Sequence, residues 1–279
     1  MAARIGHFAS RAPVQIFLVF IGLLWLVPTF GLLLTSLMPP EIINTEGWWK
    51  IFSEPSLATF DNYQAVFDNQ DIMSALWVTV QIAVGNTVLL VLISAMAGYA
   101  FAWLNFPFRD SLFVLVIALL VVPLQTALIP IFSLYQSTGL FDTVLGLVLF
   151  HTAFGLPFGI FLMRNFFIGL PKDILESARI DGASELTIFF KLVLPLGLPA
   201  IASLAIFQFL WTWNDLLVAL TFGRDTQPIT VAVFTQLRQF SGNIELIAPA
   251  SFLSLAIPLA VFLAFQRYFA QGLLAGSVK

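Results

Sequence analysis

The stretch PKDILESARIDGASELT, residues 171–187, places a cluster of charges in an otherwise apolar chain. Only 10% of the 279 residues are charged and 59% are hydrophobic. The charges of this stretch lie at Lys172, Asp173, Glu176, Arg179, Asp181 and Glu185. The sequences before and after it are typical of membrane-spanning helices. A charged helix–glycine–helix segment between two apolar spans predicts a surface that a membrane protein presents to a partner in the cytoplasm.

Turn and cap residues divide this charged stretch into two short helices. Pro171 suits the first turn of the first helix, where its missing N–H is not needed. Gly182 suits the left-handed conformation that ends a helix. Ser184 is a residue type that caps the start of the next helix. We expect the second helix to end at Pro195, just before the following span.

The composition indicates an integral helical membrane protein. A soluble domain could not bury this much apolar surface, and the mean hydropathy is +0.96. A net charge of −3 argues against nucleic-acid binding. The absence of cysteine excludes disulfides, Cys-based metal sites and thiol catalysis. The first apolar run, roughly residues 14–37, is too long for a signal-peptide core, so we expect an uncleaved anchor.

Six segments meet the requirement of about 20 apolar residues for a membrane-spanning helix. The predicted fold class is therefore all-α: a polytopic membrane protein with six transmembrane helices, forming one transmembrane domain over residues 1–279. The predicted spans are residues 14–38, 74–103, 111–135, 143–163, 198–222 and 249–271, and the charged stretch lies in a loop of residues 164–195.

The basic residues orient these spans. Lys and Arg are enriched in cytoplasmic loops, and with the N-terminus inside, nine of the 12 basic residues face the cytoplasm. Only Lys50, Arg224 and Arg238 then lie outside, together with most of the acidic residues. Both termini and the charged stretch are therefore predicted to be cytoplasmic.

The charged stretch and the residues after it resemble the EAA loop of permease subunits in binding-protein-dependent ABC importers. That family's pattern is E-A-A, three residues, G, nine residues and I-x-L-P. Here Glu176-Ser177-Ala178 precedes Gly182, and Leu192-Val193-Leu194-Pro195 follows at the same spacing. The departures are mild, with Ser for Ala and Leu for Ile. Asp181-Gly182-Ala183 matches the family's common D-G-A core.

The end of the chain resembles the second permease subunit of maltose-type sugar importers. The similar residues are Gln266-Arg267-Tyr268-Phe269, Gly272, Ala275-Gly276 and Lys279, with Trp213-Asn214-Asp215 in the fifth span. The resemblance implies a multi-pass protein of a bacterial or archaeal cytoplasmic membrane. It also implies the partners: a second permease subunit, two ATPase subunits and an external sugar-binding protein.

The resemblance assigns the ATPase contact to the charged stretch. In the family this loop docks in a cleft of the ATPase subunit, which makes Glu176 the charged docking residue and Gly182 the bend. The implied coupling residues are Glu176, Ser177, Ala178, Asp181, Gly182, Ala183, Leu194 and Pro195. The chain itself has no G-x-x-x-x-G-K-[ST] phosphate loop. We expect no cofactor, catalytic site or metal site on this chain, with ATP and Mg on the partner ATPase.

Local features of the first short helix suit such docking. Ile174 and Ala178 lie four positions apart and predict an apolar stripe. The small side chains of Ser177, Ala178 and Ala183 permit a partner to approach closely. A short, firmly packed helix can then transmit rigid-body motion without a covalent link.

Polar residues of the fifth span mark a candidate translocation path. The positions of Gln208, Trp211, Asn214 and Asp215 predict one helical face. Intramembrane charges usually face a cavity or a partner, which favours a path-lining role for Asp215. The alternative is an Asp near the interface, hydrated or paired with a neighbouring subunit. We interpret His151, in the fourth span, as a hydrogen-bonded packing residue.

Two further segments are predicted to contact partners. Gly242 and Asn243 favour a tight turn in the external segment 223–248. With Phe240 they form a candidate loop for the binding protein, as the resemblance implies. It also implies that the C-terminal tail, with Gly276 and Lys279, reaches the ATPase pair. The alternatives are a plain connector and a frayed terminus.

The predicted function is that of a membrane-spanning permease subunit of an ATP-driven carbohydrate importer. The resemblance favours an α-glucoside or disaccharide such as maltose or trehalose, and the alternative is another small solute such as glycerol phosphate. A secondary transporter would need its own ion-coupling carboxylates in the spans, where only Asp215 could serve. An intramembrane enzyme would need a triad or metal cluster, and none is suggested by the residues.

Overall fold

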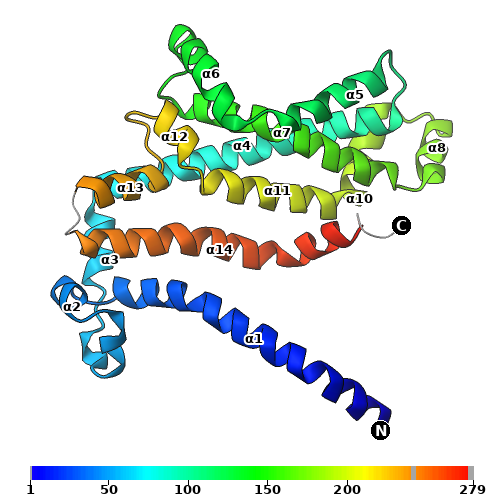
Figure 1. The fold of residues 1–279 in the computed structure, drawn as a ribbon. Coiled ribbons are helices and arrows are strands. Elements are labelled where there is room, and N and C mark those ends of the chain that lie inside the picture. Colours follow the sequence, from blue (N-terminus) through cyan, green and yellow to red (C-terminus); the bar gives the residue numbers. More distant parts are fainter. Residues whose placement is uncertain (1, 240–242, 276–279) are drawn as a thin grey trace. The chain divides into compact units, whose positions relative to one another are not determined.

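The computed structural model describes residues 2–239 and 243–275, and no strand occurs within those ranges (Figure 1). The helices are α1 (Ala2–Ser36), α2 (Pro40–Thr45), η1 (Trp48–Phe52), η2 (Pro55–Leu57), α3 (Asp61–Asp68), α4 (Gln70–Trp103), α5 (Arg109–Ala118), η3 (Leu119–Val121), α6 (Leu124–Thr138), α7 (Val144–Ile168), α8 (Lys172–Ile180), α9 (Glu185–Ile188), η4 (Phe189–Val193), α10 (Leu194–Leu196), α11 (Leu198–Trp213), α12 (Leu217–Phe222), α13 (Ile229–Gln239) and α14 (Ile244–Ala275).

Within the described ranges, four helices are long and apolar enough to cross a membrane, and the number rises to six if each of two bent pairs is one span. The four are Pro13–Ser36, Gln70–Trp103, Val144–Ile168 and Ile244–Arg267. The bent pairs are Arg109–Val121 with Leu124–Thr138, at 99°, and Glu185–Leu196 with Leu198–Trp213, at 76°. The predicted fold class of an all-helical protein with several apolar spans is confirmed.

The third predicted span, residues 111–135, is bent rather than straight. The chain leaves the helix at Val122, whose ψ is 117°, and α6 begins directly after Pro123. A residue that precedes proline is disfavoured in the helical region because the proline ring crowds its backbone. Proline therefore sets the position of this bend.

The fifth predicted span, residues 198–222, is not one helix, because α11 ends at Trp213 and α12 begins at Leu217. Nδ2 of Asn214 donates to the carbonyl oxygen of Leu210 at 2.8 Å. The Asp215 carboxylate accepts hydrogen bonds from the first turn of α12. Asn and Asp side chains compete for main-chain groups in this way, so they end one helix and start another.

By its internal contacts the chain divides into two compact units, residues 1–73 with 233–255 and residues 74–232 with 256–279. In the first unit, a buried asparagine holds the segment after α1 to α3. Nδ2 of Asn62 donates to the carbonyl oxygens of Ser36 and Met38, at 3.1 and 2.8 Å. The hydroxyls of Ser36 and Tyr63 lie 2.7 Å apart in a further hydrogen bond. The rest of α1 exposes apolar side chains from Val14 to Phe30, as suits contact with lipid.

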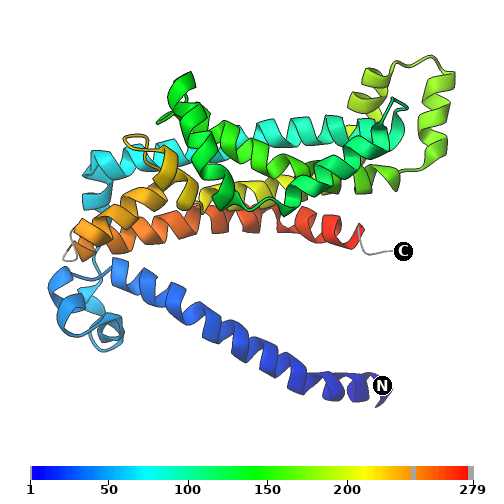
Figure 2. The same ribbon diagram turned by 45° about the horizontal axis from the view of Figure 1, so that its top comes forward.

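In the second unit, α4, α7 and α11 run side by side (Figures 1 and 2). Small residues let α4 and α7 approach closely. A Cβ atom on Gly98 would lie 2.6 Å from Cβ of Met163, and one on Gly159 would lie 2.2 Å from Oγ of Ser94. Close backbone approach at small residues is a common way to pack helices in a membrane. The charged stretch, with α8, lies at one end of this layer, and α6 and α12 lie at the other (Figure 1).

Candidate functional site

The backbone of the charged stretch follows the sequence prediction at its turn. Gly182 has a φ of +79°, in the left-handed region that favours glycine. Its N–H donates to the carbonyl of Arg179, and the N–H of Ala183 donates to that of Ala178, both at 3.0 Å. Oγ of Ser184 then accepts from the N–H of Thr187 and caps α9. The left-handed conformation predicted for Gly182 and the helix cap predicted for Ser184 are confirmed.

The end predicted for the second helix at Pro195 is wrong. The helical run passes from α9 through η4 and α10 to Leu196, and the bend of 76° comes at Gly197. η4 is a π-helical turn. Its wider winding accommodates a following proline that cannot donate a main-chain hydrogen bond. Leu194 packs against the core, whereas Pro195 is exposed.

Helix α8 buries one face and exposes the other. Leu175 is fully buried, and Ala178 and Ala183 pack on the same core. The predicted stripe of Ile174 and Ala178 is therefore wrong at its first member, because Ile174 is exposed and Leu175 takes the core position. A shift of one residue moves a helix face by 100°, and the neighbours of the stretch decide which face is buried.

The outer face of α8 combines charges with an exposed apolar side chain. Glu176, Ser177, Asp181 and Gly182 are all exposed, and Ile180 is 86% exposed. Oε1 of Glu176 lies 2.9 Å from Nζ of Lys172, one turn earlier. This face offers a partner an acid, small residues and an isoleucine side chain. The opposite face of the same helix packs on the core through Leu175.

The charged stretch is tied to α4 by a cluster that the sequence prediction missed. The Tyr99 hydroxyl of α4 donates to Oε2 of Glu185, and Nε of Arg179 donates to Oε1 of the same carboxylate at 2.8 Å. A second Arg179 nitrogen lies 3.3 Å from Oε2. Tyr99 is itself buried and packs on Phe189, with ring centroids 5.5 Å apart. One carboxylate therefore joins α8, α9 and α4.

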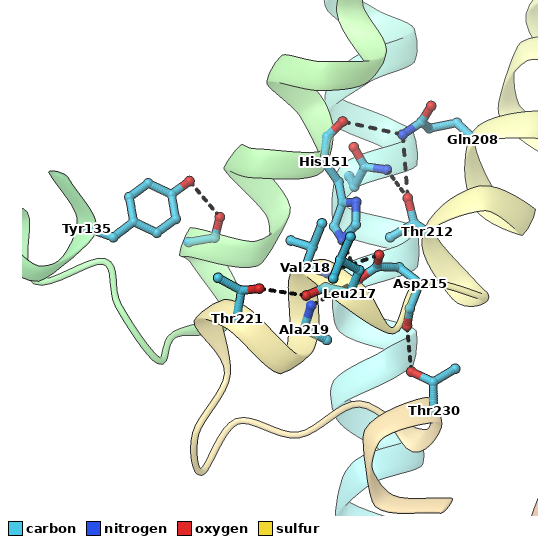
Figure 3. Close-up of polar contacts among 12 residues, drawn as sticks. Tyr135, His151, Gln208, Thr212, Asp215, Leu217, Val218, Ala219, Thr221 and Thr230 are labelled. Atoms are coloured by element: carbon cyan, nitrogen blue, oxygen red, sulfur yellow. Dashed lines mark hydrogen bonds and ion pairs between the residues drawn. The ribbon is translucent and has the colours of Figure 1, made fainter. Parts of the chain in front are cut away.

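A second polar cluster lies among α4, α7 and α11 (Figure 3). Nδ2 of Asn86 donates to Oγ1 of Thr212 at 2.6 Å, and Oγ1 of Thr152 donates to Oδ1 of Asn86 at 3.1 Å. Nε2 of Gln208 approaches the carbonyl oxygen of His151 and Oγ1 of Thr212, at 3.5 and 3.4 Å. All five side chains are buried. Three helices are thereby fixed in register by polar contacts inside an apolar layer.

Asp215 adjoins this cluster but acts first as a helix cap. Its carboxylate accepts from the N–H groups of Val218 and Ala219, at 3.3 and 3.0 Å. Its main-chain carbonyl accepts from Oγ1 of Thr230 at 2.6 Å. Oδ2 also lies 3.6 Å from Nε2 of the buried His151, as Figure 3 shows. A negative group at the start of α12 is favoured by the helix dipole.

The four predicted path residues do not share one helical face. Gln208 and Trp211 lie on α11, but Asn214 is exposed at the helix end and bonds its own helix. Asp215 turns toward His151. The sequence prediction missed this pairing because His151 lies in another span. The indole of Trp211 meets the His151 ring edge-on, with centroids 5.7 Å apart. His151 is buried, as a packing role requires, but its Nδ1 has no hydrogen-bond partner among the described residues.

The loop before α7 is bound to the loop after α12 through Asp142. Oδ1 accepts from the N–H groups of Arg224, Asp225 and Thr226, at 2.8, 2.9 and 2.8 Å. Burial alone would raise the pKa of Asp142, but these main-chain hydrogen bonds outweigh it, so the pKa lies below its ordinary value. A carboxylate that accepts several N–H groups is stabilised in its charged form.

Four of the predicted contact residues fall outside what the structure describes. Phe240 and Gly242 belong to the interval 240–242, and Gly276 and Lys279 follow residue 275. Asn243 is described, and its carbonyl accepts from the N–H groups of Leu246 and Ile247 at the start of α14. Within the described ranges, no group of three or more His, Cys, Asp or Glu side chains could hold a metal ion.

Residues 90–275 match the family described as "Binding-protein-dependent transport system inner membrane component". The chain is 45% identical to the osmoprotective compounds uptake permease protein GgtD of Synechocystis sp., over 98% of this chain and 94% of that protein. It is 48% identical to the alpha-glucoside transport system permease protein AglG of Rhizobium meliloti, over 81% of this chain and 61% of that protein. It is 38% identical to the trehalose transport system permease protein SugB of Mycobacterium tuberculosis, over 81% and 84%.

The fold also matches a solved structure. A chain from the crystal structure of a bacterial ABC transporter that imports the acidic polysaccharide alginate superposes with a TM-score of 0.77. The match covers 96% of this chain and 98% of that chain at 21% sequence identity. At that identity the likeness concerns the fold.

Proposed function

The chain belongs to the family of inner membrane components of binding-protein-dependent transport systems, and from this premise we propose that it is the permease subunit of an ATP-driven carbohydrate importer. The observation that carries the proposal is its identity of 48% and 38% to permeases named for alpha-glucoside and trehalose transport. The proposed substrate is an α-glucoside or disaccharide such as trehalose or maltose. A second candidate is an osmoprotective compound, because the relative matched over 98% of this chain carries that name.

In this proposal the permease forms half of the translocation pathway, and the second half comes from another permease subunit. ATP and Mg bind to a partner ATPase, which carries out hydrolysis, and this chain has no catalytic residues. An external sugar-binding protein delivers the substrate. Both termini and the charged stretch face the cytoplasm, as the distribution of Lys and Arg predicts.

The exposed face of α8 is the proposed ATPase contact. Glu176, Ser177 and Ile180 are accessible to a partner, while Leu175 anchors the helix in the core. ATPase closure would move α8 as a rigid body, because its packed face and the Glu185 carboxylate attach it to the spans. The proposed coupling residues remain those of the EAA-like pattern, including Leu194 and Pro195.

Two other contacts complete the proposal. The loop with Phe240, Gly242 and Asn243 contacts the binding protein, so deleting residues 240–244 should reduce ATPase stimulation by the binding protein but not basal ATPase. The tail with Gly276 and Lys279 contacts the ATPase pair, so removing the last five residues should reduce sugar-stimulated hydrolysis. Unchanged stimulation in the loop variant would make the loop a plain connector. Unchanged stimulation and unchanged assembly in the tail variant would make the tail a frayed terminus.

Reconstitution tests the proposed function directly. The chain is co-expressed with its neighbouring permease, ATPase and binding-protein genes, and the purified complex is placed in proteoliposomes. Uptake of labelled trehalose and maltose is measured with and without internal ATP. ATP-dependent uptake of either sugar supports the proposal. If the complex accumulates an osmoprotective compound but neither sugar, that compound replaces the sugar as the proposed substrate. If the purified complex contains no ATPase, the proposed class of ATP-driven transporter is wrong.

A further inference from the structure

A pocket of about 280 Å³ opens between α7 and α11 in the second unit. Its walls are aromatic side chains from both helices, and its floor combines a glycine with an amide. The lining residues are Phe154, Gly155, Phe158, Phe207, Gln208 and Trp211. This volume lies just below the usual range for ligand sites, roughly 300–1,000 Å³. A single six-membered ring is therefore a better match for this pocket than a whole oligosaccharide.

The floor of the pocket holds the Gln208 amide in one orientation. Its nitrogen faces the His151 carbonyl oxygen, which can only accept, so the nitrogen must point that way. Oγ1 of Thr212 lies 3.4 Å from the same nitrogen and also accepts a hydrogen bond from Nδ2 of Asn86. Within the described part of the chain, no donor bonds to Oε1 of Gln208, and this residue lines the pocket. An amide carbonyl in an apolar site gains free energy when it receives a hydrogen bond.

Gly155 makes room for this arrangement. A Cβ atom at position 155 would lie 2.7 Å from Oε1 of Gln208 and 2.2 Å from Cδ1 of Leu90. Any larger residue would displace the amide or the leucine that packs behind it. The glycine therefore leaves room for the amide in a pocket whose other lining residues are large aromatics.

We propose that this pocket binds one pyranose ring of the transported glycoside during its passage. This inference rests on the proposed function. The apolar C–H face of a sugar ring packs on aromatic side chains, here those of Phe158 and Trp211, and a hydroxyl donates to Oε1 of Gln208. Both rings are partly exposed and so can meet a ligand, with Trp211 at 43%. A lipid chain would match the aromatic walls but would leave the amide carbonyl without a donor. A hydroxylated ring satisfies both features.

Transport kinetics of the reconstituted complex test this site, with maltose and trehalose as the probes. Trp211→Ala should raise KM for uptake roughly tenfold, the range expected for loss of an aromatic contact. Gln208→Met keeps the side-chain length but removes the acceptor together with the amide donor to His151 and Thr212, and should raise KM about fivefold. Gly155→Ala should act like Gln208→Met. The matched control is Trp77→Ala, an exposed tryptophan of α4 that does not line the pocket; it should leave KM unchanged.

A comparison with deoxy sugars identifies the hydroxyl. Removing the hydroxyl that donates to Gln208 should raise KM in the wild type. It should cause no further rise of KM in Gln208→Met, because the two changes break the same bond. Wild-type kinetics in Trp211→Ala and Gln208→Met would overturn the site while leaving the proposed function intact. Loss of co-purification with the second permease in these variants would also overturn it, because the pocket would then be a subunit interface. A wild-type complex that transports neither sugar would instead refute the proposed substrate.

Discussion

The Tyr99 hydroxyl donates a hydrogen bond to the Glu185 carboxylate, across 86 positions of sequence. Tyr99 lies in α4, a candidate membrane span, and Glu185 begins α9 within the charged stretch. Arg179 of α8 binds the same carboxylate. Polar contacts as well as packing therefore join α8 to α4.

Tyr99→Phe should weaken the coupling of ATP hydrolysis to transport. The substitution keeps the ring and removes one hydrogen bond, a loss of about 1 kcal/mol. We expect more ATP hydrolysed per sugar transported, measured as the ratio of the two rates in proteoliposomes. Tyr135→Phe is the matched control, because its hydroxyl donates to the Gly146 carbonyl away from the charged stretch. An unchanged ratio in Tyr99→Phe, or an equal change in the control, would contradict the link.

Gly182→Val should abolish uptake, because a β-branched residue resists the left-handed conformation at a cost of about 1–2 kcal/mol. Glu176→Lys should do the same by reversing the charge on the exposed face of α8. Co-purification of the ATPase measures docking in both variants. Gly139→Val is the control for the glycine, since Gly139 has a φ of +72° and, like Gly182, open space around its Cβ position. It should destabilise the protein similarly yet retain the ATPase. Normal uptake by both loop variants would refute the docking role.

Stability should fall in acid as Asp142 becomes protonated. Its folded-state pKa lies below the unfolded value of about 3.9, so its contribution is fully present above that value. The contribution is lost as the pH falls through the lower, folded-state pKa. At pH 7, Asp142→Asn should lower the free energy of unfolding by about 1–2 kcal/mol, because charge-assisted hydrogen bonds become neutral ones.

Thermal unfolding in detergent from pH 7 to pH 3 measures this effect. The difference between wild type and Asp142→Asn should shrink as the pH approaches 3. Asp110→Asn is the control, because that side chain is 79% exposed and should show little difference at any pH. A difference between wild type and Asp142→Asn that stays constant over the whole range would rule out the carboxylate as its source.

Asp215→Ala should destabilise the second unit by about 1 kcal/mol through loss of the α12 cap. Asp215→Asn retains an oxygen that can accept from Val218 and Ala219, so it should cost less. The melting temperatures of the purified variants decide between a capping role and a charge-dependent one. If the two substitutions lower the melting temperature equally, the interaction of the charge with His151 matters more than the cap.

The sequence alone determined the features that depend on overall composition or on a few neighbouring residues. Long apolar runs specified the membrane class and the approximate spans, since burying such segments in lipid needs no partner. Gly182 and Ser184 specified their own backbone conformations, which the structure reproduces. The spacing from Glu176 to Pro195 indicated the family that the match over residues 90–275 confirms.

Tertiary structure alone decided which distant residues meet. The sequence gives no signal that Tyr99 reaches Glu185 or that Asp142 binds the N–H groups of residues 224–226. It also predicted a continuous fifth span, because apolar residues resume after Asn214 and conceal the break that Asp215 caps. Such contacts depend on how separate helices pack, and small residues such as Gly155 set that packing. Hydropathy reports how apolar a segment is, whereas the pairing of its few polar groups is settled only when the helices come together.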